Sequence, residues 1–187
     1  MRFNEIAPGQ KRNLRVVPQG LMSQFDMSYF DKIWNRLIKP NCKQILQANL
    51  LASRLLYRGF NSNEPVIRGR SHDRRITKDS SSVTTQEFDR RLAALGFKAL
   101  RGNSIFCTGN VEMAKEFGIP YIIFPIDGFD FTYCVGEYDL ELPFSATPDS
   151  MGFQWLGTQD TEAFLQDYLP RKDNLALALK EGYEVYI

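Results

Sequence analysis

The sequence predicts an α+β fold, because two helical patterns come first and the strand-like runs after them are split irregularly by helices and loops. That order favours α+β over a regular parallel α/β sheet. The chain has 187 residues, of which 43% are hydrophobic and 24% charged, and this is enough for one folded core. We expect a single domain over residues 21–187. Residues 1–20 hold two prolines and two glycines and are expected to form an extended N-terminal arm.

The first half of the chain is expected to be mostly helical. Apolar residues recur at helical spacing in two stretches, and a proline separates them. A run of strand-forming residues follows. After it comes a polar stretch of more than 20 residues, over 61–83, and a stretch of that length indicates a long loop. The elements expected are a helix over 25–37 ended by Pro40, a helix from Asn41 or Cys42 to Arg54, a strand over 55–58 stopped by Gly59, and a loop over 61–83.

The second half is expected to alternate short strands with short helices. Glycines and asparagines mark the ends of several helices, because they cap them well. The elements expected are a helix from Thr84 or Thr85 to Leu95, a strand over 104–107, a helix from Asn110 to Phe117, a strand over 121–124, a turn at Asp127-Gly128, a strand over 129–135, an irregular stretch over 143–157, a helix over 160–168, a helix from Arg171 or Lys172 to Gly182, and a strand over 183–187.

Composition excludes several classes of protein. The formal net charge is +1, so no global field attracts nucleic acid or a membrane surface. Three widely spaced cysteines and a single histidine predict neither a zinc site nor a disulfide framework. The chain has no apolar run of about 18 residues, so we expect no membrane span. We predict a cytoplasmic protein, or one delivered into a cytoplasm by another route.

Three short strand-like runs carry side chains with a clear chemical use. The first ends in Arg58-Gly59, the second places hydroxyls at Ser104 and Thr108, and the third carries Glu184. A guanidinium binds phosphate oxygens in a bidentate way, and a glycine lets other groups approach its backbone. A carboxylate in an apolar strand is costly to bury without a partner. Taken singly, Arg58 is also explained as an arginine at a strand end beside a turn glycine, and Glu184 as an outward-facing residue of an edge strand.

Arginine, then serine or threonine, then glutamate, on three separate strands in this order, resembles the signature of mono-ADP-ribosyltransferases. The ending Glu184-Val185-Tyr186-Ile187 is also similar to that family's Glu-Val-Leu-Ile type ending. The resemblance covers roughly residues 50–187. It implies two small facing β-sheets with N-terminal and flanking helices, and NAD as the substrate in the cleft between them. It also implies transfer of ADP-ribose to a macromolecular acceptor, protein or nucleic acid, by a toxin or effector, including phage-encoded ones.

The resemblance implies a role for each residue. Glu184 would stabilise the oxocarbenium-like ribose, Arg58 would hold the phosphates or ribose of NAD, and the Gly59 backbone would bind the nicotinamide amide. Either Ser104 or Thr108 would take the role of the family's serine, which orients the glutamate. Two phenylalanines are candidates to stack on nicotinamide, although core packing is the alternative for each: Phe106 and Phe117.

The most concentrated charge lies in residues 68–75, which hold four arginines. Arg68 and Arg70 are candidates to contact the NAD pyrophosphate, a nucleic acid or an acidic acceptor. The alternative is a solvated loop whose arginines pair with nearby acids.

Two other functions compete with the transferase. Gly182 stands where many arginine-modifying members of the family carry a second glutamate, and the serine element is incomplete. Both features favour a non-catalytic structural or binding protein that retains the fold. A nucleic-acid-binding module that uses the arginine loop is a third hypothesis, which the near-neutral net charge disfavours.

Overall fold

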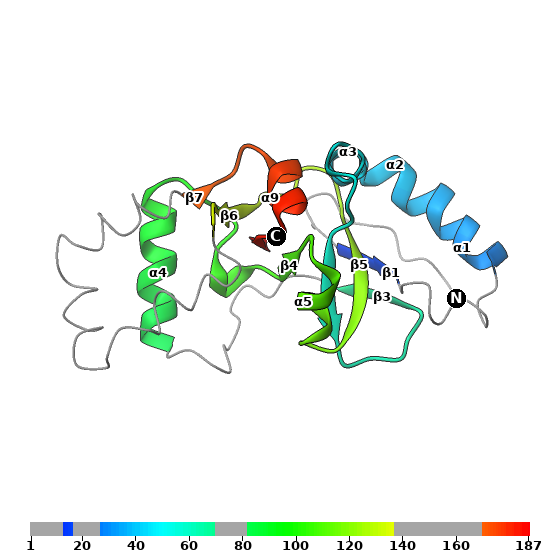
Figure 1. The fold of residues 1–187 in the computed structure, drawn as a ribbon, viewed down its shortest axis with the longest axis horizontal. Helices are drawn as coiled ribbons and strands as arrows, with labels where there is room; N and C mark the ends of the chain where they lie inside the picture. Colours follow the sequence, from blue (N-terminus) through cyan, green and yellow to red (C-terminus); the bar gives the residue numbers. More distant parts are fainter. Residues whose placement is uncertain (1–12, 17–26, 70–81, 137–169) are drawn as a thin grey trace.

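The computed structural model describes residues 13–16, 27–69, 82–136 and 170–187 (Figure 1). Its strands form one antiparallel sheet in the order β3-β1-β5-β2-β4-β8-β6-β7, so the α+β prediction is confirmed. The strands are β1 (Asn13–Val16), β2 (Tyr57–Phe60), β3 (Val66–Gly69), β4 (Phe106–Thr108), β5 (Ile119–Pro125), β6 (Thr132–Cys134), β7 (Pro170–Arg171) and β8 (Glu184–Tyr186).

The sheet narrows sharply between β2 and β4. These strands share only the register pair Tyr57 with Thr108, whereas β2 and β5 pair over four residues. The two halves, β3-β1-β5-β2 and β4-β8-β6-β7, are thus joined at one position. The described strands therefore form one sheet with a narrow junction, and not the two small facing sheets that the resemblance implied, because the Tyr57–Thr108 pair connects the halves.

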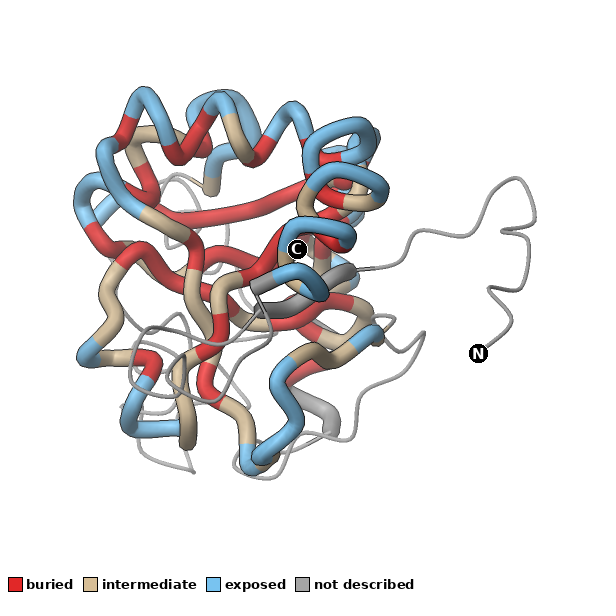
Figure 2. The backbone as a smooth tube through the Cα atoms, turned by 90° about the vertical axis from the view of Figure 1, so that its right-hand side faces the viewer, coloured by how far each residue is buried: buried red, intermediate tan, exposed pale blue. Residues whose placement is uncertain are grey.

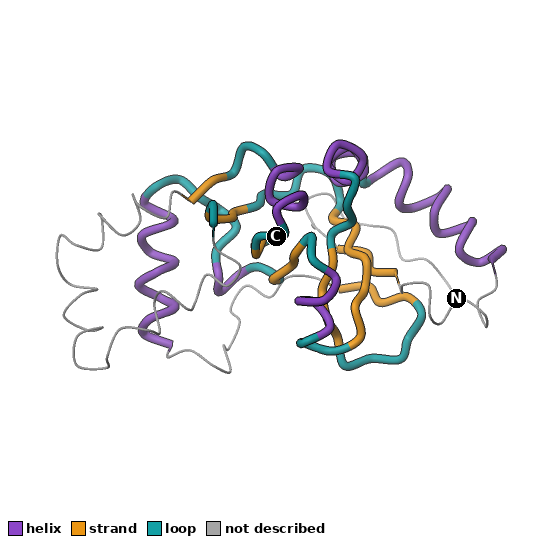
Figure 3. Tube along the Cα trace, in the orientation of Figure 1, coloured by secondary structure: helices purple, strands orange, loops and turns teal. Residues whose placement is uncertain are grey.

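Helices surround this sheet (Figure 3). In Figure 1, α3 and α9 lie side by side above the strands, and α4 stands at the opposite end of the molecule from α1. The helices are α1 (Met27–Ile33), the π-helix η2 (Trp34–Ile38), α2 (Lys39–Asn41), α3 (Lys43–Ala52), α4 (Ser82–Ala94), the 3-10 helix η3 (Arg101–Asn103), α5 (Val111–Lys115) and α9 (Leu175–Glu181).

The sequence predicted that Pro40 ends the first helix. In the structure Pro40 lies inside α2. Proline has no N–H, and its ring clashes with the carbonyl four residues earlier. The preceding turn widens into the π-helix η2, in which the N–H of Lys39 donates to the carbonyl of Trp34, five residues back. The wider turn lets the chain continue helically to Asn41.

Helix α3 agrees with the prediction in place but not in the face that it buries. Its buried side chains are Ile45, Ala48, Asn49 and Ala52. Leu50 and Leu51, which belong to the predicted apolar pattern, are 79% and 69% exposed.

Several predicted strand boundaries are wrong. Gly59 does not stop a strand but lies inside β2, and β5 begins two residues earlier than predicted, so that it includes Pro120, while it ends at Pro125. Asp127-Gly128 does form a turn, with Gly128 at φ 82°, but no hairpin follows from it, because β5 pairs with β1 and β2 while β6 pairs with β7 and β8.

Other predictions are confirmed to within a few residues. Helix α4 ends before Gly96, which has φ 81°, and the side chain of Asn110 caps α5 by accepting the N–H of Glu112. Helix α9 ends at Gly182 and β8 closes the described chain. Within the expected N-terminal arm, residues 13–16 form β1 between β3 and β5. The irregular stretch over 143–157 and the helix over 160–168 lie outside the described residues.

Buried residues run through the strands and the inner faces of the helices (Figure 2). They form two clusters, which lie on opposite faces of the β4–β8 pair, because neighbouring strand residues alternate in direction. Cys107 and Val185 join the larger cluster with α3 and α9. Tyr186 joins the smaller one with Phe88 and Leu92 of α4, and Phe106 packs against it.

Candidate functional site

The three predicted motif strands are neighbours in the sheet, in the order β2-β4-β8. Glu184 is in register with Thr108, and Thr108 is in register with Tyr57, the residue before Arg58. The N–H groups of Ile105 and Ile187 each donate to the other's carbonyl, at 2.8 and 3.0 Å. Alternation along an antiparallel pair makes Thr108 and Glu184 a non-hydrogen-bonded pair, in which side chains approach most closely.

Thr108 ties the turn before β8 to β4. Its hydroxyl donates to the carbonyl of Gly182 at 2.9 Å and accepts the N–H of Asn110 at 3.0 Å. The side chain is only 7% exposed, so water replaces these bonds poorly. Thr108 therefore fixes the backbone two residues before Glu184.

Ser104, the other predicted hydroxyl, lies outside β4. Its hydroxyl donates to the amide oxygen of Asn103 at 3.1 Å, and the residue is buried. The register places Ser104 four residues from the position opposite Glu184. Of the two hydroxyls, the structure brings only that of Thr108 beside Glu184.

The Arg58 side chain connects β2 to β4 beyond the single register pair that these strands share. Its Nη1 donates to the carbonyl of Phe106 at 2.7 Å. Its guanidinium carbon lies 5.1 Å from the ring centre of Phe60 and 6.0 Å from that of Phe106. These are cation–π distances, so two rings hold the charge in place. The Nε of Arg58 is buried and has no hydrogen-bond partner.

Phe106 lies at the centre of a group of rings and cations that the sequence did not predict. It stacks on Tyr186, with ring centres 4.8 Å apart and planes at 30°. The guanidinium carbon of Arg101 lies 4.9 Å from the Phe106 ring centre, and its Nη1 donates to the Tyr186 hydroxyl at 3.3 Å. Arg101 is 7% exposed. A single arginine before a turn gives no sequence signal of this placement.

Asp89 of α4 holds Arg101 in position through its backbone. The carboxylate oxygens of Asp89 accept the N–H of Arg101 at 2.7 Å and that of Gly102 at 2.8 Å. Burial raises the pKa of Asp89, while these two N–H groups and the charge of Arg101 lower it. A Cβ at Gly102 would lie 2.6 Å from the carboxylate oxygen Oδ2 of Asp89, so a side chain there would disturb the arrangement.

The charges of Glu184 and Arg101 both act on the Tyr186 phenol. Burial first, and then the negative charge of Glu184, raise the pKa of the Tyr186 phenol well above its ordinary value, while Arg101 lowers it. Glu184 and Phe106 are half-buried, whereas Tyr186 and Thr108 are buried. Half-buried Glu184 thus lies next to two buried residues that carry hydroxyl groups, Thr108 and Tyr186.

Gly59 and Phe117 lie against each other at the far side of β2. A Cβ on Gly59 would lie 2.2 Å from the carbonyl oxygen of Ala114 and 2.6 Å from the carbonyl carbon of Phe117, so Gly59 has to be glycine for α5 to pack. The Phe117 side chain is 69% exposed, so the alternative that it belongs to the core is wrong.

Of the two predicted loop arginines, the structure describes only Arg68, which does not lie in the predicted loop but on a strand away from Glu184. Arg68 is exposed and lies on β3, three strands away from β2. At about 4.8 Å between neighbouring strands, this separation is roughly 14 Å. Arg70 lies outside the described residues.

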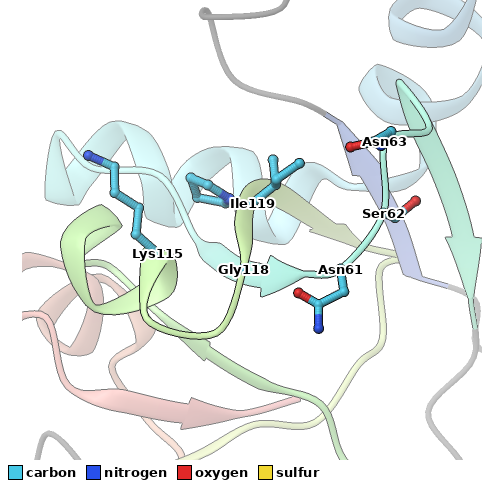
Figure 4. Close-up of a pocket in the computed structure, with 7 residues that line it drawn as sticks. Asn61, Ser62, Asn63, Lys115, Gly118 and Ile119 are labelled. Carbon is cyan, nitrogen blue, oxygen red and sulfur yellow. The ribbon is translucent and has the colours of Figure 1, made fainter.

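A shallow surface hollow lies away from Glu184, near the end of β2 (Figure 4). Asn61, Ser62 and Asn63 line it from the loop after β2, and Lys115 lines it from α5. The ammonium of Lys115 is paired with Glu112 at 2.7 Å. The hollow therefore presents amides and a hydroxyl rather than an unpaired charge.

Over the described ranges, no helix is long and apolar enough to cross a membrane, and no group of three or more histidine, cysteine or acidic residues is placed to hold a metal ion. The thiols of three described cysteines are buried and form no disulfide in the described part of the chain: Cys42, Cys107 and Cys134.

Comparison with known proteins adds no relative to these observations. No protein-family model, no curated protein and no solved structure matches this chain.

Proposed function

We propose that the protein is an NAD-dependent ADP-ribosyltransferase that moves ADP-ribose to a macromolecular acceptor. The observation that carries the proposal is the placement of Arg58, Thr108 and Glu184 on the adjacent strands β2, β4 and β8. These residues are far apart in the sequence, and the pairing of the three strands brings them to one region of the sheet.

In this proposal Glu184 acts on the ribose of NAD. The bond between ribose C1′ and the nicotinamide nitrogen breaks, and its electron pair leaves with neutral nicotinamide. The carboxylate of Glu184 binds the 2′-hydroxyl and stabilises the positive charge that develops on the ribose, as in glycoside cleavage. A nucleophile of the acceptor then bonds to C1′ and loses its proton.

Thr108 takes the role of the family's serine. It holds Gly182, at the start of the turn into β8, and lies opposite Glu184, so it fixes the height and direction of the carboxylate. Arg58 holds β4 through the carbonyl of Phe106 and brings a positive charge to the place where the NAD phosphates would bind.

The backbone of Gly59 suits a nicotinamide amide. Ile123 donates its N–H to Leu56, so Leu56 is hydrogen-bonded to β5, and alternation directs the N–H and C=O of Gly59 away from β5. They point to the side where β4 has already separated from β2. The backbone of Phe117 lies next to this glycine, and its side chain is 69% exposed, so we favour it over Phe106 to stack on nicotinamide.

One experiment tests the proposal directly. The protein is incubated with labelled NAD and a cell lysate, beside Glu184→Gln, and nicotinamide release is measured in parallel. We expect label on macromolecules with the wild type alone, and nuclease or protease sensitivity then gives the acceptor class. A labelled product with Glu184→Gln would remove the central residue of the mechanism.

A non-catalytic protein of the same fold is the second candidate. It is favoured because the side chains of Arg58 and Phe106 are engaged in contacts within the protein. Both side chains already make internal contacts, to a carbonyl and to stacked rings. Thermal unfolding with NAD separates the two functions. Binding at a hundredfold excess over Kd stabilises a protein by about 2.7 kcal/mol. No shift in Tm, together with no nicotinamide release, would favour the binding or structural function.

A toxin or effector that acts in a cytoplasm is the biological role that this activity suggests. Its acceptor is the property that the labelling experiment identifies.

A further inference from the structure

We propose that Tyr186 is a positioning residue for the carboxylate of Glu184, and that Arg101 acts through the Tyr186 hydroxyl. This inference rests on the proposed function. The roles of Tyr186 and Arg101 are not part of the resemblance, because the Arg–Ser–Glu pattern assigns no residue to either position.

The strand geometry brings Tyr186 and Glu184 to the same face. They are alternate residues of β8, and each lies opposite an alternate residue of β4: Phe106 faces Tyr186 and Thr108 faces Glu184. The stacking distance of 4.8 Å between the Phe106 and Tyr186 rings confirms this face directly. The four side chains form a two-by-two block, in which Thr108 and Tyr186 are the buried neighbours of Glu184.

The Tyr186 hydroxyl is oriented by a hydrogen bond from Arg101. Its oxygen accepts from Nη1 of Arg101 at 3.3 Å, so its own proton is directed toward other groups. Glu184 is the anion on the same strand face, and its charge acts on the Tyr186 phenol. A hydroxyl that accepts from a cation is a stronger donor to an anion, because the two bonds polarise each other.

Arg101 is placed for this role by a separate structural device. Both carboxylate oxygens of Asp89 bind backbone N–H groups at Arg101 and Gly102, so the start of η3 is fixed to α4. The guanidinium also lies over the Phe106 ring at 4.9 Å. A residue held by its backbone, a ring and a hydroxyl is suited to orient a neighbour but not to reach a substrate, and with 7% exposure it is buried.

Tyr186→Phe is the sharpest test, because it removes one hydroxyl and keeps the ring that stacks on Phe106. We expect kcat for nicotinamide release to fall at least tenfold, with KM for NAD and the NAD-induced rise in Tm changed less than twofold. Tyr133→Phe is the matched control. Tyr133 is also fully buried, but it is in register with Val185 and so lies on the opposite face from Glu184. It should keep the wild-type kcat.

Arg101 is tested by a double-mutant cycle with Tyr186. Arg101→Lys keeps the charge and should retain more kcat than Arg101→Met. Because Arg101 acts through the hydroxyl, Arg101→Met should lower kcat by less than twofold when Tyr186 is already phenylalanine. Melting curves of each variant verify folding, and if Arg101→Met does not fold, Arg101→Lys in the two backgrounds gives the coupling.

The outcomes separate this inference from the function on which it rests. If the wild type turns over NAD and Tyr186→Phe has the same kcat, the positioning role is refuted and the transferase proposal is unaffected. Wild type with neither turnover nor NAD binding would refute the transferase and this inference with it. Equal losses in Tyr133→Phe and Tyr186→Phe would show a general effect of core hydroxyls, and the inference would fail.

Discussion

Replacing Thr108 by valine tests whether the hydroxyl beside Glu184 holds the entry to β8. Valine has nearly the same shape, so the change removes the hydroxyl and leaves no cavity. Two hydrogen bonds are lost, to the Gly182 carbonyl at 2.9 Å and from the Asn110 N–H at 3.0 Å. A buried donor or acceptor left unpaired costs about 1–3 kcal/mol. Because Asn110 is half-buried and water reaches it in part, we expect a loss of about 2–4 kcal/mol.

Urea unfolding followed by circular dichroism measures this loss, and thermal melting gives a second value. In a protein of this size each kcal/mol lowers Tm by about 2–4 °C. Thr108→Ser is the control, because it keeps the hydroxyl and loses one methyl group, worth about 0.8 kcal/mol. If the valine variant were within about 0.5 kcal/mol of the wild type, the two bonds would carry no net stability and the bracing role would be refuted.

The same variant links stability to function. With the turn at Gly182 released, Glu184 loses its fixed position, so nicotinamide release by Thr108→Val should fall at temperatures where the protein is still folded. Thr108→Ser should keep most of it.

Three further predictions concern the rest of the fold. Gly109→Ala should destabilise by about 3 kcal/mol or more in urea unfolding, because its Cβ would lie 1.9 Å from the carbonyl oxygen of Leu179; a folded variant of unchanged stability would show that α9 can shift. Leu50→Ala should cost less than about 0.5 kcal/mol and Ile45→Ala about 2–5 kcal/mol, since the first side chain is 79% exposed and the second fully buried; equal losses would contradict the buried face of α3. Burial raises the pKa of Cys42 from 9.0 to about 12, so its thiol binds a proton more tightly in the folded state, and this contribution to stability is present below pH 9 and is lost as the pH rises toward 12. The stability advantage of wild type over Cys42→Ala should therefore shrink over that range, and a constant difference would contradict it.

Elements that depend only on neighbouring residues could be predicted from the amino-acid sequence. Asn110 caps α5 and Gly182 ends α9, because an amide side chain or a glycine satisfies helix ends through local geometry. The order of helices and short strands was enough for the α+β class, and the strand at residues 184–186 followed from its apolar pattern.

Features that depend on contacts between distant residues could not be predicted in this way. Gly59 looked like the end of a strand, but it lies inside β2 because the backbone of α5 packs against it. Pro40 looked like the end of a helix, but a π turn accommodates it. Leu50 fitted the helical stripe, although the face that meets α9 and the sheet is turned away from it.

The candidate site divides in the same way. The sequence named Arg58, Thr108 and Glu184, because the residue types and their order are visible along the chain. It did not choose between Ser104 and Thr108, because that choice depends on which residue of β4 lies in register with Glu184. Arg101 and Tyr186 were not predicted as residues of the site. Their contact joins residues 85 positions apart, and only the pairing of β4 with β8 and the attachment of η3 to α4 bring them together.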